Sequence, residues 1–310
     1  MKKSLLILLF TCWALFFAAF RPVMPFAAET AAFPDGPPVT GGRILMGTIG
    51  EPSNLIPYMA SDSASGEITG LLHVAPLKYD KDLNVVPWAA ASYEVLEGGR
   101  LLRFVLRDDI RWEDGVPLTA DDVEFTYKLM IDPKTPTAYS GDFLAIESFK
   151  KTGRLSFEVR YAKPFARSLM TWMGAILPKH VLEGQDIMTT PVARKPIGAG
   201  PYRLAKWDAG SMLTLTASDT YFEGRPNLDE VVYRIIPDPS TMFLELKAGK
   251  LDMMSLSPQQ YLRQTQGPQW ERDWRKYRYL SFSYTFLGFN LEHPFFKDVR
   301  VRRAISMAID

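Results

Sequence analysis

Five carboxylates occur within fifteen residues, in the stretch RWEDGVPLTADDVEF at positions 111–125. Two acids that face each other across a cleft hydrolyse glycosides, so a catalytic pair is one interpretation. The local pattern favours a structural one: Asp114-Gly115 is a turn signal, Thr119 is placed as a helix N-cap, and Asp122 completes a capping box. Acids in a first helical turn are also stabilised by the positive end of the helix dipole. We therefore predict a turn and a capped helix here, and no catalytic residue.

The histidines and the glycine-rich stretch offer no stronger chemistry. His73, His180 and His293 are far apart and have no HxxH or HExxH neighbour, so neither a metal nor another cofactor is expected. The stretch Gly198-Ala199-Gly200-Pro201 lacks the lysine and hydroxyl pair of a phosphate-binding loop, and its proline removes an amide donor. We predict a turn between lobes at this position.

Two hydrophobic periodicities, alternation in strands and a three-to-four-residue spacing in helices, indicate the elements that position these residues. In LRFVLR, alternation places Leu102, Phe104 and Leu106 on one face, which predicts a half-buried strand. Further strands are expected at 43–47, 155–161, 212–218 and 231–237, and helices near 120–131, 166–173, 239–248 and 298–310. We place a loop at Ser61–Ser65 and a helix after it, carrying Ile68, Leu71 and Leu72. This mixture predicts a mixed α/β (α+β) fold with more than one lobe.

The N-terminal residues have the order of a secretory leader. Lys2 and Lys3 precede an apolar run, and small residues at Ala27 and Ala28 precede the first acid. We predict a signal peptide at 1–28 that is cleaved to give a periplasmic protein, with an uncleaved membrane anchor as the alternative.

Composition sets broad limits on the class of protein. The chain has 310 residues, of which 47% are apolar and 23% charged, which is typical of a globular chain with about two domains. Its 36 basic and 35 acidic residues are interspersed, so no nucleic-acid partner is expected. Its one cysteine, Cys12, lies in the predicted leader, so the mature protein would have no disulfide.

Several blocks together carry a family resemblance. The run LRFVLRDDIRWEDGVPLTADDVEFTY resembles the signature of the family 5 extracellular solute-binding proteins, the dipeptide-, oligopeptide- and nickel-binding components of bacterial ABC importers. Other blocks match in the family's order, and together they cover about residues 43–310: GEPSNLIP, VVPWAAASYEV, PIGAGPYRLAKWDAG, YFEGRPNLDEVVYRIIPD, AGKLDM and FNLEHPFFKDVRVRRAISMAID.

The resemblance implies a periplasmic binding protein-like fold of type II with an inserted second domain. The expected organisation is a signal peptide at 1–28, a flexible entry segment at 29–42, a larger lobe from 43–75 and 185–290, an inserted domain II at 76–184, and the start of a third domain at 291–310. Family members continue by about a further domain. The last helical pattern has an apolar face and no stop signal after it, so we expect this sequence to be the front part of a longer protein, with a natural C-terminal helix as the alternative.

Candidate ligand-binding residues also follow from the resemblance. Asp62, Ser63, Ala64 and Ser65 fall where family members line the cleft with an extended strand that pairs with the peptide backbone. Tyr139 falls where an aromatic residue of the smaller lobe reaches the cleft. Phe289 and Asn290 fall at a hinge-side strand near the ligand. For each of these residues, ordinary loop or core packing is the alternative.

The function implied is that of an exported solute receptor, not an enzyme. The protein is expected to be a monomer that captures a short peptide or a similar small solute and delivers it to the membrane permease of an ABC transporter. Two alternatives remain: a secreted hydrolase with a carboxylate-lined cleft, and a receptor that presents a bound solute to a signalling partner. The solute itself is not identified by the sequence; peptides, nickel chelates, opines and oligosaccharides are all possible cargoes.

Overall fold

The computed structural model describes residues 37–278 and 286–309, in two compact units. Residues up to Leu256 form one unit, and the segments from Ser257 onward belong to the other and are described by themselves. The predicted signal peptide and most of the entry segment lie outside the described residues. The predicted domain boundaries stay predictions.

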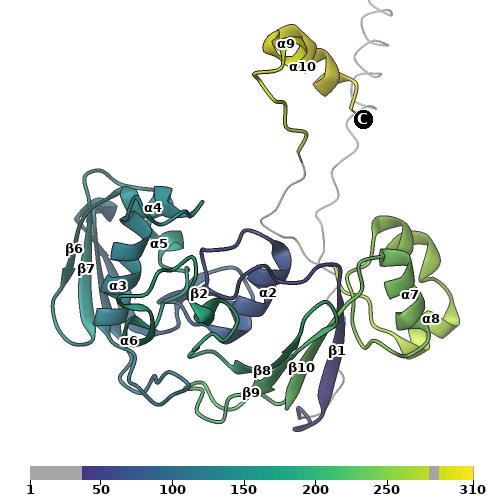
Figure 1. Ribbon diagram of the computed structural model, residues 1–310, viewed down its shortest axis with the longest axis horizontal. Helices are drawn as coiled ribbons and strands as arrows, with labels where there is room; N and C mark the ends of the chain where they lie inside the picture. Colours follow the sequence, from purple (N-terminus) through teal and green to yellow (C-terminus); the bar gives the residue numbers. More distant parts are fainter. Residues whose placement is uncertain (1–36, 279–285, 310) are drawn as a thin grey trace, which may run out of the picture. The chain divides into compact units, whose positions relative to one another are not determined.

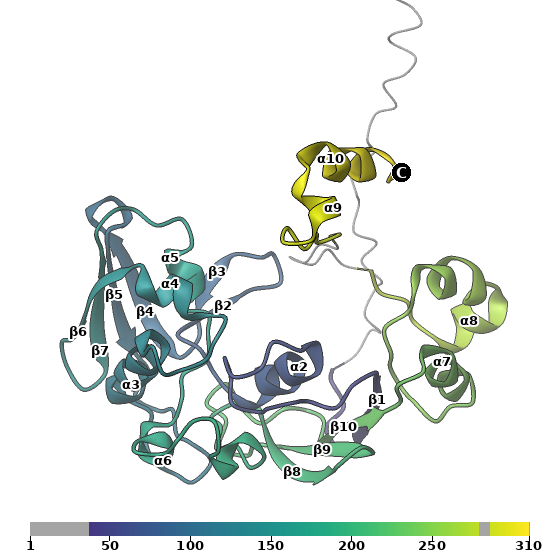
Figure 2. The ribbon, with the colours of Figure 1, turned by 45° about the horizontal axis from the view of Figure 1, so that its top comes forward.

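One four-stranded sheet joins the start of the chain to its middle (Figure 1). Its order is β1 (Arg43–Thr48), β10 (Glu230–Ile235), β9 (Met212–Ala217) and β8 (Tyr202–Asp208); β1 is parallel to β10, and the other pairs are antiparallel. The helix α2 (Ser63–Leu72) packs on this sheet through Ile68 and Leu72 (Figure 2). Residues of β1, although far from β10 in the sequence, thus pack on the same hydrophobic cluster as α2, β8, β9 and β10.

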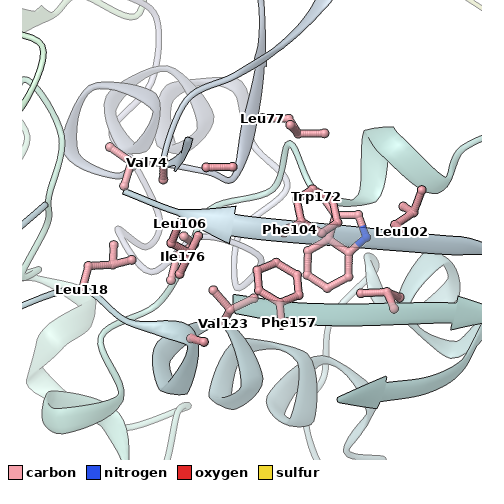
Figure 3. Packing of buried hydrophobic residues seen from close by; sticks show 14 of the residues in the cluster. Val74, Leu77, Leu102, Phe104, Leu106, Leu118, Val123, Phe157, Trp172 and Ile176 are labelled. Carbon is pink, nitrogen blue, oxygen red and sulfur yellow. The ribbon is translucent and has the colours of Figure 1, made fainter. Parts of the chain in front are cut away.

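A second sheet is antiparallel throughout and has the order β4 (Ala90–Leu96), β5 (Leu101–Leu106), β7 (Ser156–Tyr161) and β6 (Ile146–Lys151). The predicted period-two faces are confirmed, because Phe104 and Phe157 are fully buried and stack 4.8 Å apart. Trp172 packs beside them, and α3 (Ala120–Ile131) adds Val123 (Figure 3). Each aromatic ring in this cluster buries a large apolar area.

Shorter elements complete the described chain. In the first unit they are β2 (Leu77–Tyr79), β3 (Val85–Pro87), η1 (Glu97–Gly99), α4 (Ser140–Leu144), α5 (Ser168–Thr171), α6 (Lys179–Leu182), η2 (Pro191–Ala193) and α7 (Pro239–Lys247). In the other unit they are η3 (Gln260–Gln264), α8 (Pro268–Asp273), α9 (Pro294–Lys297) and α10 (Val299–Met307). All of the predicted strands and helices are present, with ends shifted by a few residues. Over residues 37–278 and 286–309, every helix is too short or too polar to cross a membrane.

The carboxylate-rich stretch has the structural role predicted for it. Thr119 and Asp122 form the capping box of α3. One carboxylate oxygen of Asp122 accepts from the Thr119 backbone N–H at 2.8 Å, and the other accepts from the backbone N–H of Lys179 at 2.9 Å. The side chain is 4% exposed, so this acid joins the start of α3 to the start of α6 and faces no cleft.

The glycines of the predicted inter-lobe turn lie against the last turn of α2. The Gly200 N–H donates to the Leu72 carbonyl at 2.9 Å, and the Gly198 carbonyl accepts from the Glu113 N–H at 2.9 Å. A Cβ at Gly198 would lie 1.9 Å from the Leu72 oxygen. This close backbone approach connects α2 to the turn that precedes α3, and only glycine permits it.

His73 ends α2 and ties it to the preceding loop. Its backbone N–H donates to the Thr69 carbonyl at 3.0 Å, and its ring Nε2 lies 3.3 Å from the Leu55 carbonyl oxygen. Because that partner can only accept, Nε2 carries the proton. Burial lowers the pKa of His73 to about 4 against a smaller opposing effect of this hydrogen bond, so the ring is neutral at pH 7.

Replacing Asp122 with alanine should destabilise the fold by about 2 kcal/mol, because two partly buried backbone amides lose their acceptor. Asp121→Ala, which removes a partly exposed partner of Lys151, should cost about 0.5 kcal/mol or less. Urea denaturation measures both. A catalytic or binding role for the stretch would be indicated if Asp122→Ala kept its stability and lost solute binding.

The variant Gly198→Ala should lose about 1–3 kcal/mol of stability, because the added methyl group meets a backbone carbonyl that cannot move alone. The matched control is Gly50→Ala, where the added Cβ meets nothing within 4 Å. Thermal unfolding of the two variants is the measurement. Equal melting temperatures would show that the backbone at Gly198 has room for a methyl group beside the Leu72 carbonyl.

His73 should make stability depend on pH. The unfolded chain takes up the proton near pH 6.5 and the folded chain only near 4, so this contribution is complete above pH 6.5. As the pH decreases from 6.5 to 4, the contribution of His73 to the free energy of unfolding should fall by about 1.4 kcal/mol for each pH unit. His73→Leu should flatten the unfolding free energy over this range, measured by urea denaturation at several pH values.

Glu113 acts in the opposite direction, because burial raises its pKa to about 7 and its contribution is lost as pH rises from 4.5 towards 7. The His73 prediction therefore concerns the difference between variant and parent. Glu113→Gln provides a second background for the same comparison. Parallel pH profiles for parent and His73→Leu in both backgrounds would contradict the prediction.

Candidate functional site

A cavity of about 310 Å³ lies between α2 and the segment that follows α5. Its wall comes from five separate segments of the chain, which span residues 54 to 175. The lining residues are Asn54, Ile56, Pro57, Tyr58, Ala60, Ser65, Gly66, Thr69, Gly70, His73, Val74, Ala75, Trp88, Tyr139, Met173, Gly174 and Ala175. This volume is within the range of small-molecule sites, about 300–1,000 Å³.

One face of α2 forms a wall of small residues. The cavity is lined by Ser65, Gly66, Thr69 and Gly70, whose spacing puts them on one side of the helix, and by His73 directly after its end. A Cβ at Gly66 or Gly70 would meet nothing within 4 Å, so no packing contact requires either glycine. Glycine inside a helix costs about 0.5–1 kcal/mol relative to alanine. The two glycines expose helix backbone to the cavity at that cost.

Tyr58 crosses the cavity from the loop before α2. Its backbone is in the left-handed region, with φ of 72°, which is unusual for a residue with a large side chain. Its hydroxyl donates to the Ala175 carbonyl at 2.8 Å, and a Cβ at Gly174 would lie 2.2 Å from that hydroxyl. The Tyr139 ring meets the Tyr58 ring edge-on, with centroids 5.9 Å apart. Burial raises the pKa of Tyr58, so its hydroxyl stays protonated.

The polar groups of the wall are mostly satisfied within the protein. The Ser65 hydroxyl donates to Asp62 and accepts from the Ser53 N–H, and the Thr69 hydroxyl donates to the Ser65 carbonyl. The Asn54 side-chain oxygen accepts from the Ile56 N–H. These bonds hold the loop and the first turn of α2 together before any solute arrives.

No aspartate, glutamate, lysine or arginine is among the described residues that line this cavity. A glycosidase needs two carboxyl groups about 5–10 Å apart, and no such pair faces this space. Among those same residues no cluster of three metal-ligating side chains is found either. The wall presents aromatic rings, methyl groups and helix backbone to the cavity.

The structure brings two of the predicted binding residues together, because Ser65 and Tyr139 both line the cavity. Asp62, Ser63 and Ala64 do not. The expected loop at 61–65 is wrong for residues 63–65, which form the first turn of α2 and are therefore not an extended strand. Asp62 instead caps α2, accepting from the Ser65 N–H at 2.8 Å and from the Ser53 hydroxyl at 2.6 Å. Its carboxylate is used by its own helix.

Phe289 and Asn290 belong to the separate C-terminal segment, and their position relative to the cavity is not described. Within that segment, the Phe289 ring lies 5.2 Å from the Phe296 ring, and the Asn290 side chain accepts from the Glu292 N–H at 3.0 Å. Their predicted role in binding stays a prediction.

Sequence reasoning missed most of the wall. Gly66 and Gly70, four residues apart in an apolar helical pattern, were the available signal for a bare helix face. His73 was considered as a metal ligand and set aside; it is buried and lines the cavity, and its Nδ1 has no partner among the described residues. Trp88 and Met173 gave no signal, since aromatic and apolar residues are more often core.

A second cavity, of about 590 Å³, lies beside β8 and has a charged rim. Two of its cations already have partners: Arg194 pairs with Glu51 at 3.6 Å and lies over the Trp207 ring, and Lys206 pairs with Asp208 at 2.8 Å. None of the predicted binding residues lines it. We therefore take the cavity beside α2 as the candidate site.

Comparison with known proteins identifies the family to which the chain belongs. A model described as bacterial extracellular solute-binding proteins, family 5 Middle, matches residues 84–310. The oligopeptide-binding protein AppA of Bacillus subtilis (strain 168) is 32% identical over 281 residues, which is 89% of this chain and 51% of AppA. The chain spans about half the length of the curated relatives it matches.

Solved structures give the same result for the fold. The structure of AppA from Bacillus subtilis in complex with a nonapeptide aligns with a TM-score of 0.79 at 30% identity, over 88% of this chain and 55% of that one. NikZ from Campylobacter jejuni in complex with Ni(L-His) aligns at 0.74 and 25% identity, over 86% and 53%. The predicted fold class is confirmed, and the chain belongs to the family 5 bacterial extracellular solute-binding proteins.

Proposed function

We propose that this protein is the exported substrate-binding component of an ABC transporter, which captures a short peptide or a similarly sized solute and delivers it to a membrane permease. The single observation that carries the proposal is the preformed cavity beside α2 in a chain of this family. Its relative AppA is an oligopeptide-binding protein, and the solved AppA structure holds a nonapeptide. Peptides are therefore the first solutes to test.

The proposed mechanism is capture without bond chemistry. Ligand-binding domains of two or more lobes close around a solute by rotation at a few hinge residues. A solute that contacts both walls binds the closed form more tightly and so shifts the population towards it. We infer that the wall described here supplies one side of the closed site. The other side would come from parts of the protein that are not placed relative to this cavity.

The predicted secretory leader supports a periplasmic location, where a permease could meet the loaded receptor. Members of this family are binding proteins, which argues against a secreted hydrolase. The neutral lining argues the same way, because it offers no general acid or nucleophilic carboxylate. We infer a monomer that holds its solute non-covalently and passes it on unchanged.

Substituting Gly66 or Gly70 with alanine should separate stability from binding. Each variant should gain about 0.5–1 kcal/mol of stability, because alanine is the better helix former and its methyl group meets no clash. Each should bind its solute about tenfold more weakly, because the methyl group occupies space that the solute uses. Thermal shift with a di- to pentapeptide library identifies the solute, and calorimetry measures its affinity.

The matched control is Gly141→Ala in α4, another helical glycine where a Cβ meets nothing within 4 Å but which does not line the cavity. It should leave affinity unchanged. The experiment should use the protein as its gene encodes it. If no peptide raises the melting temperature, transport of peptides is wrong; if peptides bind and the glycine variants bind equally well, the site lies elsewhere.

A further inference from the structure

The charge around the cavity beside α2 gives more information about its solute than the shape does. Every residue in the described lining is uncharged by type except His73, whose ring is buried and neutral. The remaining polar side-chain atoms are hydroxyls, a carboxamide and the Trp88 indole N–H. The hydroxyls of Ser65 and Thr69, the side-chain oxygen of Asn54 and the Trp88 indole are already hydrogen-bonded within the protein. The wall is therefore apolar in its surface and neutral in its charge.

Charges that lie close to this wall in the chain are directed into other interactions. Glu67, next to Gly66 on α2, accepts a hydrogen bond from the Tyr233 hydroxyl. Asp62, at the start of α2, is held by its own helix and by Ser53. Lys78 pairs with Glu223 at 2.7 Å, on the side of Trp88 where its ammonium group lies 5.4 Å from the ring centroid. Neither carboxylate nor ammonium is free to meet a charge brought in by a solute.

This arrangement penalises a charged solute group. Moving an ionised carboxylate or ammonium group from water into a site without a partner costs several kcal/mol, even after the protein relaxes. An apolar or aromatic group gains about 25 cal/mol for each Å² it removes from water. The rings of Tyr58, Tyr139 and Trp88 and the Met173 side chain offer that surface.

We propose that this wall receives an uncharged, apolar or aromatic part of the solute and excludes charged side chains, so that one position of a bound peptide is restricted to neutral residues. The inference rests on the proposed function and names its substrate class. Gly66 and Gly70 are the specificity-determining positions, because a side chain placed there would project into the same space as the solute group.

The test compares matched neutral and charged peptides on the protein as its gene encodes it. Tetrapeptides in an alanine background carry glutamine or glutamate, and norleucine or lysine, at each position in turn, and calorimetry measures each affinity. We expect one position at which glutamine binds at least about tenfold tighter than glutamate, and norleucine at least about tenfold tighter than lysine. Other positions should show smaller differences.

A charge placed on the wall then tests the location. Both Gly66→Asp and Gly66→Lys occupy part of the cavity, so they should weaken the binding of every peptide. At the restricted position, Gly66→Asp should raise the affinity for lysine relative to norleucine, and Gly66→Lys the affinity for glutamate relative to glutamine, each ratio by about tenfold. Gly141→Asp adds the same charge to an exposed helix outside the lining and should change neither preference.

The outcomes separate this inference from the proposed function. Peptides that bind with no neutral preference at any position overturn the inference and leave the function standing. A restricted position that does not respond to Gly66→Asp or Gly66→Lys overturns the assignment to this wall. Absence of binding by every peptide overturns peptides as the solute, and the inference with them.

Discussion

At Gly198 and Gly200 the backbone lies so close to the last turn of α2 that a side chain at either position would clash with it. Two hydrogen bonds use this approach: Gly200 donates to Leu72, and Gly198 accepts from Glu113. The first bond holds the C-terminal end of α2, and the second holds the turn that leads to α3. Because α2 is one wall of the cavity, the spacing of that wall depends on two missing side chains about 130 residues further along the chain.

The cavity itself is built in a similar way, by leaving side chains out. Gly174 admits the Tyr58 hydroxyl, while Gly66 and Gly70 leave helix backbone uncovered. The first absence is filled by the protein, and the other two are not filled by any of the described residues. Helix glycines without a packing partner reduce stability. The proposed binding of a solute beside Gly66 and Gly70 would account for them. Proteins commonly give up some stability at functional sites in this manner.

The acidic residues of the carboxylate-rich stretch suggest a catalytic site, but its buried acid, Asp122, caps a helix. Asp122 and Asp62 both accept hydrogen bonds at helix starts, and both are consumed by backbone amides. None of the described residues that line the cavity beside α2 has a carboxylate. A carboxylate-rich sequence can thus belong to a protein whose binding wall is neutral, because capping a helix and lining a cavity call for different side chains.

The sequence by itself determined what depends on near neighbours. Alternation of Leu102, Phe104 and Leu106 specified a half-buried strand, and Thr119 with Asp122 specified a helix start, because these interactions span two to four residues. The ordered motifs also pointed to the correct family. Only the tertiary structure decided which residues share the cavity: Tyr58, His73 and Met173 meet there from separate segments, and no local period records such a meeting. The start of α2 was misplaced because the Asp62 cap competed with a serine-rich stretch that is equally typical of a loop.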